Sequence, residues 1–136
     1  MTIGDALGWM RRHHPRDTAL ATVDAVNRRE WERLRKLLAD DFFYIDGEGN
    51  RIDTPDRFVT SVRGLVAAAP DFTIDVEDFE DAGAMCYMHG RTVSDDFRFR
   101  SHSMWRARIS HGRMECLENF RATNAMRLTK YDPQVA

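Results

Sequence analysis

The spacing of apolar residues changes once along the chain, near residue 71. Before that point apolar residues recur every three to four positions, as in amphipathic helices, and after it they alternate with polar residues, as in half-buried strands. Two linkers between the later strands are short enough for hairpins, so the sheet is predicted to be largely antiparallel. Because helices and strands are segregated, the chain is predicted to form an α+β fold with helices on one face of a curved sheet.

Local signals place three helices and five strands. The first helix is expected to begin at Asp17 or Thr18, after Pro15 has ended an N-terminal segment, and the second near Glu30. The third is expected to begin at Thr54, an N-cap followed by proline at the first helical position. The strands are expected in "FFYID", "FTIDVEDF", "AMCYMHGRTV", "FRFRSHSMWRARI" and "RMECLENFRA".

Composition narrows the class of protein. With 136 residues and 43% hydrophobic content, the chain suits one domain with a real core. Its net charge is −2, from 20 basic and 22 acidic residues, which does not indicate a nucleic-acid partner. No apolar run is long enough to span a bilayer and no signal peptide is recognisable, so cytoplasmic residence is expected and no membrane partner. Eighteen of the basic residues are arginines, a bias that hints at a bacterium with GC-rich codons.

Motifs for metals and cofactors are absent. The five histidines include no pair spaced four apart, and the two cysteines have no close spacing. The loop "DGEGNRI" has Arg51 where a calcium loop needs glycine, and it lacks the third glycine of a dinucleotide turn. We therefore predict no metal and no cofactor.

Two segments suggest a family. The stretch "VNRREWERLRKLLADDFFYIDGEG" resembles the opening of the nuclear transport factor 2-like superfamily, especially its SnoaL-like branch, and "MWRARISHGRMECLENF" resembles that family's closing hairpin. The resemblance covers residues 17–123, leaving 1–16 as an N-terminal extension and 124–136 as a C-terminal tail. It implies a cystatin-like roll, a cone-shaped half-barrel of sheet wrapped around three N-terminal helices, and a homodimer formed through the outer sheet face.

The family also implies roles for single residues. Its members include ketosteroid isomerases, polyketide cyclases, scytalone-type dehydratases and epoxide hydrolases, besides plain binding modules. In the isomerase-like pattern Asp46 is the general base, whereas the pattern's tyrosine and second acid are replaced by Thr22 and Ser103. In the dehydratase-like pattern His89 is catalytic, and Asn27 stands where an aspartate orients that histidine.

Asp46 has two interpretations. A carboxylate at the end of the apolar strand "FFYI" lies between hydrophobic walls, which suits a general base with Tyr44 or His89 as proton donor. Alternatively, aspartate before glycine simply closes a tight turn with short local hydrogen bonds. His89 also has two interpretations. The dehydratase-like pattern puts it inside the cone, whereas Cys86 and Met88 on the opposite face of the strand form the more core-like set and would put His89 outside.

The later strands supply a candidate pocket. Alternation puts one group on a single face, which should look into the cone: Phe97, Phe99, Ser101, Ser103, Trp105 and Ala107. Ser103 beside Trp105 would be a polar point on an aromatic wall, with Asn119 from the last strand and Phe58 from the third helix also pointing inward. Asn27 completes the candidate substrate-binding residues. A packed strand whose serines bind backbone groups is the structural alternative. The arginines of the opposite face are expected to pair across strands rather than to bind nucleic acid.

Together these features predict a small hydrophobic carbonyl compound as ligand. The leading hypothesis is cofactor-free acid–base chemistry in the cavity, as in an isomerase, dehydratase or cyclase. The alternative is a non-catalytic ligand-binding or dimerisation module in which Asp46 only closes a turn. Nothing in the sequence identifies the substrate.

Overall fold

The computed structural model describes residues 14–121 and 128–134. The described chain forms α2 (Pro15–Asn27), α3 (Trp31–Leu37), β1 (Leu38–Asp46), β2 (Arg51–Ile52), α4 (Pro55–Ala68), β3 (Thr73–Ala82), β4 (Met85–Val93), the 3-10 helix η1 (Phe97–Phe99), β5 (Ser101–Ser110), β6 (Arg113–Arg121) and the 3-10 helix η2 (Leu128–Tyr131). None of these helices is long and apolar enough to cross a membrane. The predicted extension 1–16 lies almost wholly outside the described residues, as does part of the predicted tail.

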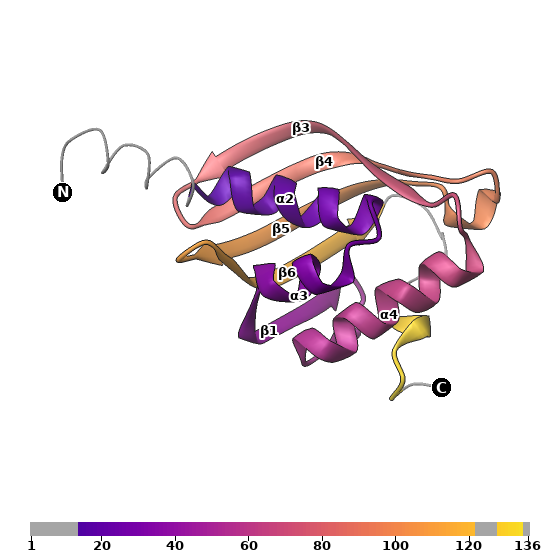
Figure 1. Ribbon diagram of the computed structural model, residues 1–136. Coiled ribbons are helices and arrows are strands. Elements are labelled where there is room, and N and C mark those ends of the chain that lie inside the picture. The colour runs from indigo at the N-terminus through magenta and orange to yellow at the C-terminus, as the bar shows by residue number, and fades with distance from the viewer. Residues whose placement is uncertain (1–13, 122–127, 135–136) are drawn as a thin grey trace, which may run out of the picture.

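The strands form one six-stranded sheet in the order β2-β1-β6-β5-β4-β3. All neighbours are antiparallel except β1 and β6, which pair in parallel. The sheet bends around the helices, with α2 and α3 crossing its inner face and α4 lying beside its β1 edge (Figure 1). The predicted α+β fold with a mainly antiparallel sheet and three helices on one face is confirmed, although the parallel pair was not anticipated.

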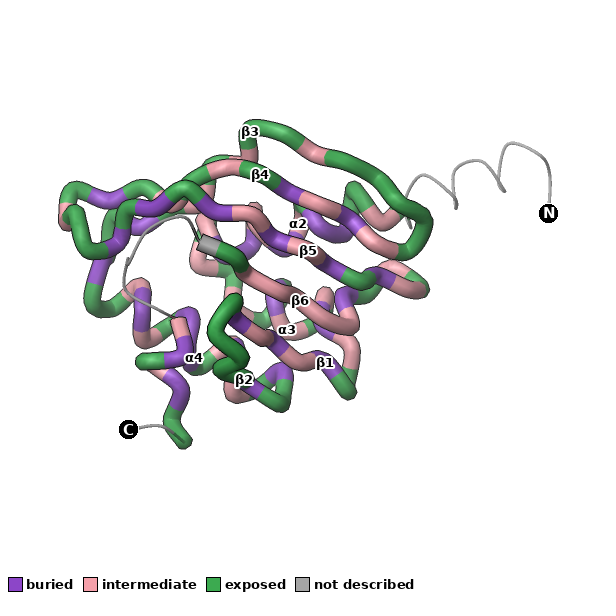
Figure 2. The backbone as a smooth tube through the Cα atoms, turned by 180° about the vertical axis from the view of Figure 1, so that it is seen from behind, coloured by how far each residue is buried: buried purple, intermediate pink, exposed green. Residues whose placement is uncertain are grey.

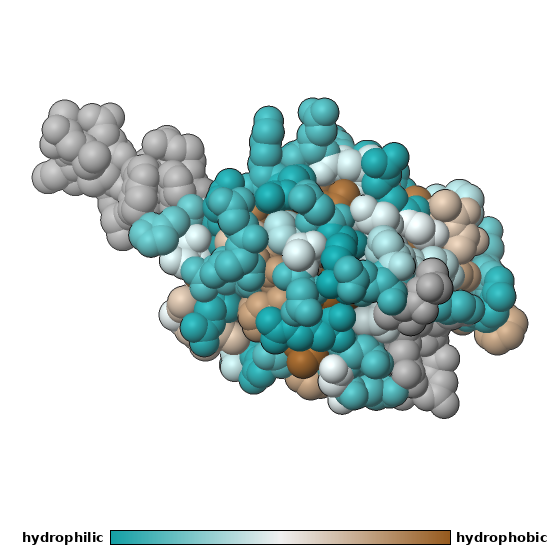
Figure 3. Space-filling model, turned by 90° about the horizontal axis from the view of Figure 1, so that it is seen from below, coloured by the Kyte–Doolittle hydropathy of each residue, from teal (hydrophilic) through white to brown (hydrophobic). Residues whose placement is uncertain are grey.

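The outer face of the sheet, opposite the helices, is not covered by another helix of the described chain (Figure 1). Seen from behind, the strands alternate between buried and more exposed residues, and β3 at the edge is mostly exposed (Figure 2). Seen from below, hydrophilic residues cover most of the surface, with hydrophobic ones in separate spots (Figure 3). The main core therefore lies between the helices and the inner face of the sheet, around Leu34, Leu38, Phe42 and Ile52.

Helix starts follow local chemistry. Thr54 caps α4 as predicted, because its hydroxyl accepts a hydrogen bond from Arg57 N–H at 3.1 Å and Pro55 occupies the first turn. The predicted start of α2 was wrong. Pro15 opens that helix, ahead of the predicted Asp17 or Thr18, and His14 Nδ1 accepts the Arg16 N–H.

The predicted fourth strand was too long at its beginning. Phe97–Phe99 form η1 rather than a strand, because the Asp96 carboxylate accepts the Arg98 N–H and starts a helical turn. Phe99 is buried as expected, but Phe97 is 78% exposed and does not face the interior. Strand alternation begins only at Ser101, where β5 starts.

Candidate functional site

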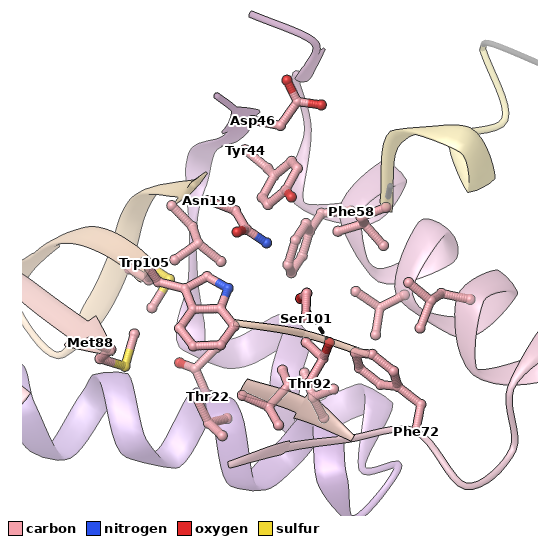
Figure 4. Close-up of a pocket in the computed structure, with 18 residues that line it drawn as sticks. Thr22, Tyr44, Asp46, Phe58, Phe72, Met88, Thr92, Ser101, Trp105 and Asn119 are labelled. Carbon is pink, nitrogen blue, oxygen red and sulfur yellow. Dashed lines mark hydrogen bonds between the residues drawn. The ribbon is translucent and has the colours of Figure 1, made fainter. Parts of the chain in front are cut away.

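An apolar cavity of about 90 Å³ lies between the helices and the inner face of the sheet. Its wall is formed by residues of α2, α4 and η2 and of the strands β1, β3, β4, β5 and β6. Its lining is dominated by aliphatic and aromatic side chains, with a few polar groups among them (Figure 4). The cavity is smaller than the roughly 150 Å³ cavity known to hold benzene in another protein, so a ligand that fits without rearrangement is small.

The sheet places three predicted residues in one row. Asp46 on β1 pairs with Asn119 on β6, and Asn119 pairs with Trp105 on β5. Because side chains at paired positions project to the same face, all three reach the cavity wall. The parallel pairing of β1 with β6 thus brings Asp46 and Asn119, which are far apart in the sequence, into one site.

Asp46 is only 7% exposed, and hydrogen bonds surround its carboxylate. Oδ1 accepts the backbone N–H groups of Glu48 at 2.9 Å and Asn50 at 3.0 Å. Oδ2 accepts Asn50 Nδ2 at 3.0 Å and the hydroxyl of Thr129 at 3.5 Å. A carboxylate offers about four lone-pair positions, so all are engaged.

The carboxylate closes the β1–β2 turn and points away from the middle of the cavity (Figure 4). Both interpretations of Asp46 therefore capture part of its position: it is buried against the cavity, and it is also the hydrogen-bonding residue of a turn. Its longest contact is the one from Thr129 on η2, and this is the contact that an incoming group could replace most readily.

Tyr44 and Phe58 lie where the sequence places them. Both side chains are buried and line the cavity beside Asp46. Their rings are 5.6 Å apart between centroids, and Phe58 also contacts Phe42 edge-on at 4.9 Å. This aromatic packing holds the tyrosine against the wall.

Trp105 and Asn119 form the middle of the cavity wall. The indole nitrogen of Trp105 and the amide of Asn119 both face inward (Figure 4). Asn119 Oδ1 is buried and has no hydrogen-bond partner among the described residues. An unpaired buried acceptor is costly, and it is the strongest sign of ligand recognition in this cavity.

Ser103 is buried as predicted but is not one of the residues that line the cavity. Its hydroxyl lies 2.9 Å from that of Ser101, which lines the cavity and lies 2.9 Å from the hydroxyl of Thr92. Thr22 on α2 also lines the cavity. Ser101 could have been selected from the sequence, because alternation put it on the same inward face as Ser103 and Trp105.

The prediction that His89 acts inside the cavity was wrong. His89 is exposed on the outer side of β4, whereas Cys86 and Met88 on the same strand point inward and are buried. The core-like residues therefore decide the orientation of the strand, as their composition suggested. His89 cannot exchange a proton with a ligand in the cavity.

Asn27 does not line the cavity either. Its amide donates to the carbonyl of Ile74 at 2.9 Å and accepts the N–H of the same residue at 2.8 Å. This pair of bonds joins the end of α2 to strand β3. The substrate-binding role assigned to Asn27 is therefore wrong, and its role in this structure is to fix the helix on the sheet.

Metal ligands are not gathered in the part of the chain that the structure describes. No group of three or more histidine, cysteine, aspartate or glutamate side chains there could hold an ion. The polar groups of the cavity wall are a carboxylate, hydroxyls, an amide and an indole N–H. Such groups bind and orient organic molecules and can move protons.

The family follows from the sequence match. A family model described as SnoaL-like polyketide cyclase matches residues 16–93, more than half of the chain. The chain belongs to this family. The resemblance seen in the opening segment is thereby confirmed, while the closing segment lies outside the matched residues. No curated protein matches the chain.

Solved structures show the same fold for this SnoaL-like protein. It is similar to IdmH, a putative polyketide cyclase from Streptomyces antibioticus, with 22% identity, a TM-score of 0.70 and coverage of 81% of this chain and 93% of that one. A putative ketosteroid isomerase from Kribbella flavida shares 19% identity over 83% and 81%, with a TM-score of 0.70. An uncharacterized cystatin fold protein from Novosphingobium aromaticivorans shares 13% identity over 77% and 96%, with a TM-score of 0.69. The cystatin-like fold class is confirmed.

Proposed function

We propose that this SnoaL-like protein binds a small, largely apolar carbonyl compound in the cavity between its helices and its sheet. The observation that carries the proposal is the indole N–H of Trp105, a donor that faces a cavity lined mainly by apolar side chains (Figure 4). A carbonyl oxygen can only accept hydrogen bonds, so it suits this donor. The row formed by Asp46, Asn119 and Trp105 supplies polar groups at separate points of the wall.

Acid–base chemistry on the bound compound is the catalytic form of this proposal. Asp46 would take a proton from the carbon next to the carbonyl, and Tyr44 would donate to the oxygen that develops negative charge. For Asp46 to act, a lone pair of Oδ2 has to turn toward the ligand. The 3.5 Å contact from Thr129 is the weakest of the four bonds, so its loss would release that lone pair at little cost. The similarity to a putative ketosteroid isomerase and a putative polyketide cyclase is consistent with this chemistry.

Deuterium exchange tests both steps without knowledge of the natural substrate. Cyclopentanone in D2O would be followed by NMR for saturable binding and for protein-dependent exchange of its α-protons. We expect exchange in the wild type and in His89→Gln, because His89 lies outside the cavity. We expect Asp46→Asn to lose the exchange while keeping the turn, since an asparagine oxygen can still accept the two backbone N–H groups.

Thr129→Val provides the complementary variant. It removes only the hydroxyl that contacts Asp46 Oδ2, so exchange should stay constant or rise if that carboxylate is the base. Binding of cyclopentanone with no exchange in any variant would support the non-catalytic alternative, in which Asp46 closes a turn. Absence of both binding and exchange would refute the proposal.

A homodimer through the outer sheet face remains our expectation for the assembly. Phe43 and Met104 on that face are half-buried, and Phe120, near the end of β6, is exposed and pairs in register with Met104. Apolar residues on an open sheet face are typical of a surface that pairs with another copy. Light scattering of the wild type and of Phe120→Lys tests this, because a charge at that position should yield monomers.

A further inference from the structure

Several hydroxyl groups around the cavity already donate their protons to other oxygen atoms. Thr92 Oγ1 lies 2.7 Å from the carbonyl oxygen of Phe99, and a carbonyl can only accept, so the Thr92 proton goes there. The 2.9 Å contact between Ser101 and Thr92 then requires Ser101 to donate. By the same reasoning Ser103 donates to Ser101 across 2.9 Å.

The third hydroxyl of the wall follows the same rule. Thr22 Oγ1 donates to the carbonyl oxygen of Thr18 at 2.8 Å. Thr22, Thr92 and Ser101 thus turn only lone pairs toward the cavity. Asn119 Oδ1 adds a buried acceptor with no partner in the described chain. Four acceptor atoms therefore border one small apolar space.

We propose that the ligand carries a hydrogen-bond donor, a hydroxyl or an enol, and donates its proton to Asn119 Oδ1. This inference rests on the proposed function and specifies the ligand further, since a plain ketone has no proton to donate. The indole N–H of Trp105, which faces the cavity, can donate to the oxygen of the same hydroxyl (Figure 4).

Matched probes test the inference. Cyclopentanol and cyclopentanone have the same ring, but only the alcohol donates a hydrogen bond. We expect NMR titration of the full chain to show cyclopentanol binding about tenfold more tightly, the difference expected when a buried acceptor finds a partner. The preference should disappear in Asn119→Leu, which has a similar shape and no acceptor. Met104→Leu, on the outer face of the same strand as Ser101, should keep the preference.

Thermal unfolding separates ligand recognition from a structural role. If Asn119 serves the ligand, Asn119→Leu removes an unpaired buried acceptor, and the Tm should stay constant or rise by about 3 °C. A fall in Tm together with an unchanged preference for the alcohol would overturn the inference. If Asn119→Leu does not fold, an unchanged preference in Asn119→Ala overturns it as well.

The remaining outcomes are distinct. Cyclopentanone binding as tightly as cyclopentanol in the wild type would overturn this inference while leaving the proposed function intact. Failure of both probes to bind would overturn the inference and the proposed function together.

Discussion

Arg57 on α4 and Asp132 after η2 form an ion pair whose two sides differ in exposure. Arg57 Nε lies 3.1 Å from Asp132 Oδ1, and Nη2 contacts Oδ2, so the guanidinium donates two hydrogen bonds to the carboxylate. The side chain of Asp132 is 1% exposed and that of Arg57 is 22% exposed. The pair holds η2, which carries Leu128 in the cavity wall and Thr129 beside Asp46.

Removing the two partners should therefore cost different amounts. Arg57→Met leaves a buried carboxylate without its counter-charge and should lower the free energy of unfolding by about 3 kcal/mol. Asp132→Asn leaves an arginine that can turn toward water and should cost about 1 kcal/mol. Urea denaturation of both variants measures the two losses. Equal losses, or a larger loss for Asp132→Asn, would contradict this explanation.

The same pair predicts an acid-sensitive contribution to stability. Burial by itself raises the pKa of Asp132, but hydrogen bonds from Arg57 and the Gln134 N–H, with the charge of Arg57, outweigh it and leave the pKa below its ordinary value. A carboxyl whose pKa is lower when folded stabilises the protein above its unfolded pKa of about 3.9, and this stability is lost as pH falls further. The difference in unfolding free energy between wild type and Asp132→Asn should thus be constant from pH 7 to about 5. It should shrink below about pH 4, and a difference that grows with acid would rule this out.

Asn27 should matter for stability and not for ligand binding. Asn27→Ala removes both bonds to the backbone of Ile74 and should lower the free energy of unfolding by about 1–3 kcal/mol. The neighbouring Arg28→Ala removes only an exposed ion pair with Asp24 and should change it by less than about 1 kcal/mol. Chemical denaturation measures both. A normal unfolding free energy in Asn27→Ala with weakened binding of cyclopentanol would instead restore the predicted substrate role.

Gly90 is required by a close approach of two strands. A Cβ atom there would stand 2.0 Å from the carbonyl oxygen of Asp75 on β3, where the register with β4 shifts. Because the obstacle is backbone, Gly90→Ala should cost about 1–3 kcal/mol and loosen the β3–β4 pairing. Gly47→Ala is the control, since its Cβ would meet a side-chain atom of Phe120 at 3.3 Å, which can move. Amide hydrogen exchange in β3, faster in the first variant and unchanged in the second, is the expected result.

Local patterns predicted much of this molecule. The cap at Thr54 and the alternation from Ser101 to Ala107 depend on neighbours within a few residues, so the sequence carries them directly. Alternation along β4 predicted that His89 and Met88 face opposite sides of the sheet, and the more hydrophobic side correctly indicated the interior. His89 faces outward, so the resemblance to the dehydratase-like pattern does not extend to a histidine in the cavity.

The sequence by itself determined the class of fold, the family and the candidate residues, because periodicity, caps and motifs are properties of short segments. Only the tertiary structure decided that β1 pairs in parallel with β6, which sets Asp46 beside Asn119. It also decided that the Asp46 carboxylate binds its turn and Thr129, while Asn119 Oδ1 has no hydrogen-bond partner among the described residues. The physical reason is that a hydrogen bond forms only between groups that are close in space. Segments that are distant in the sequence come close only when the chain folds around its core.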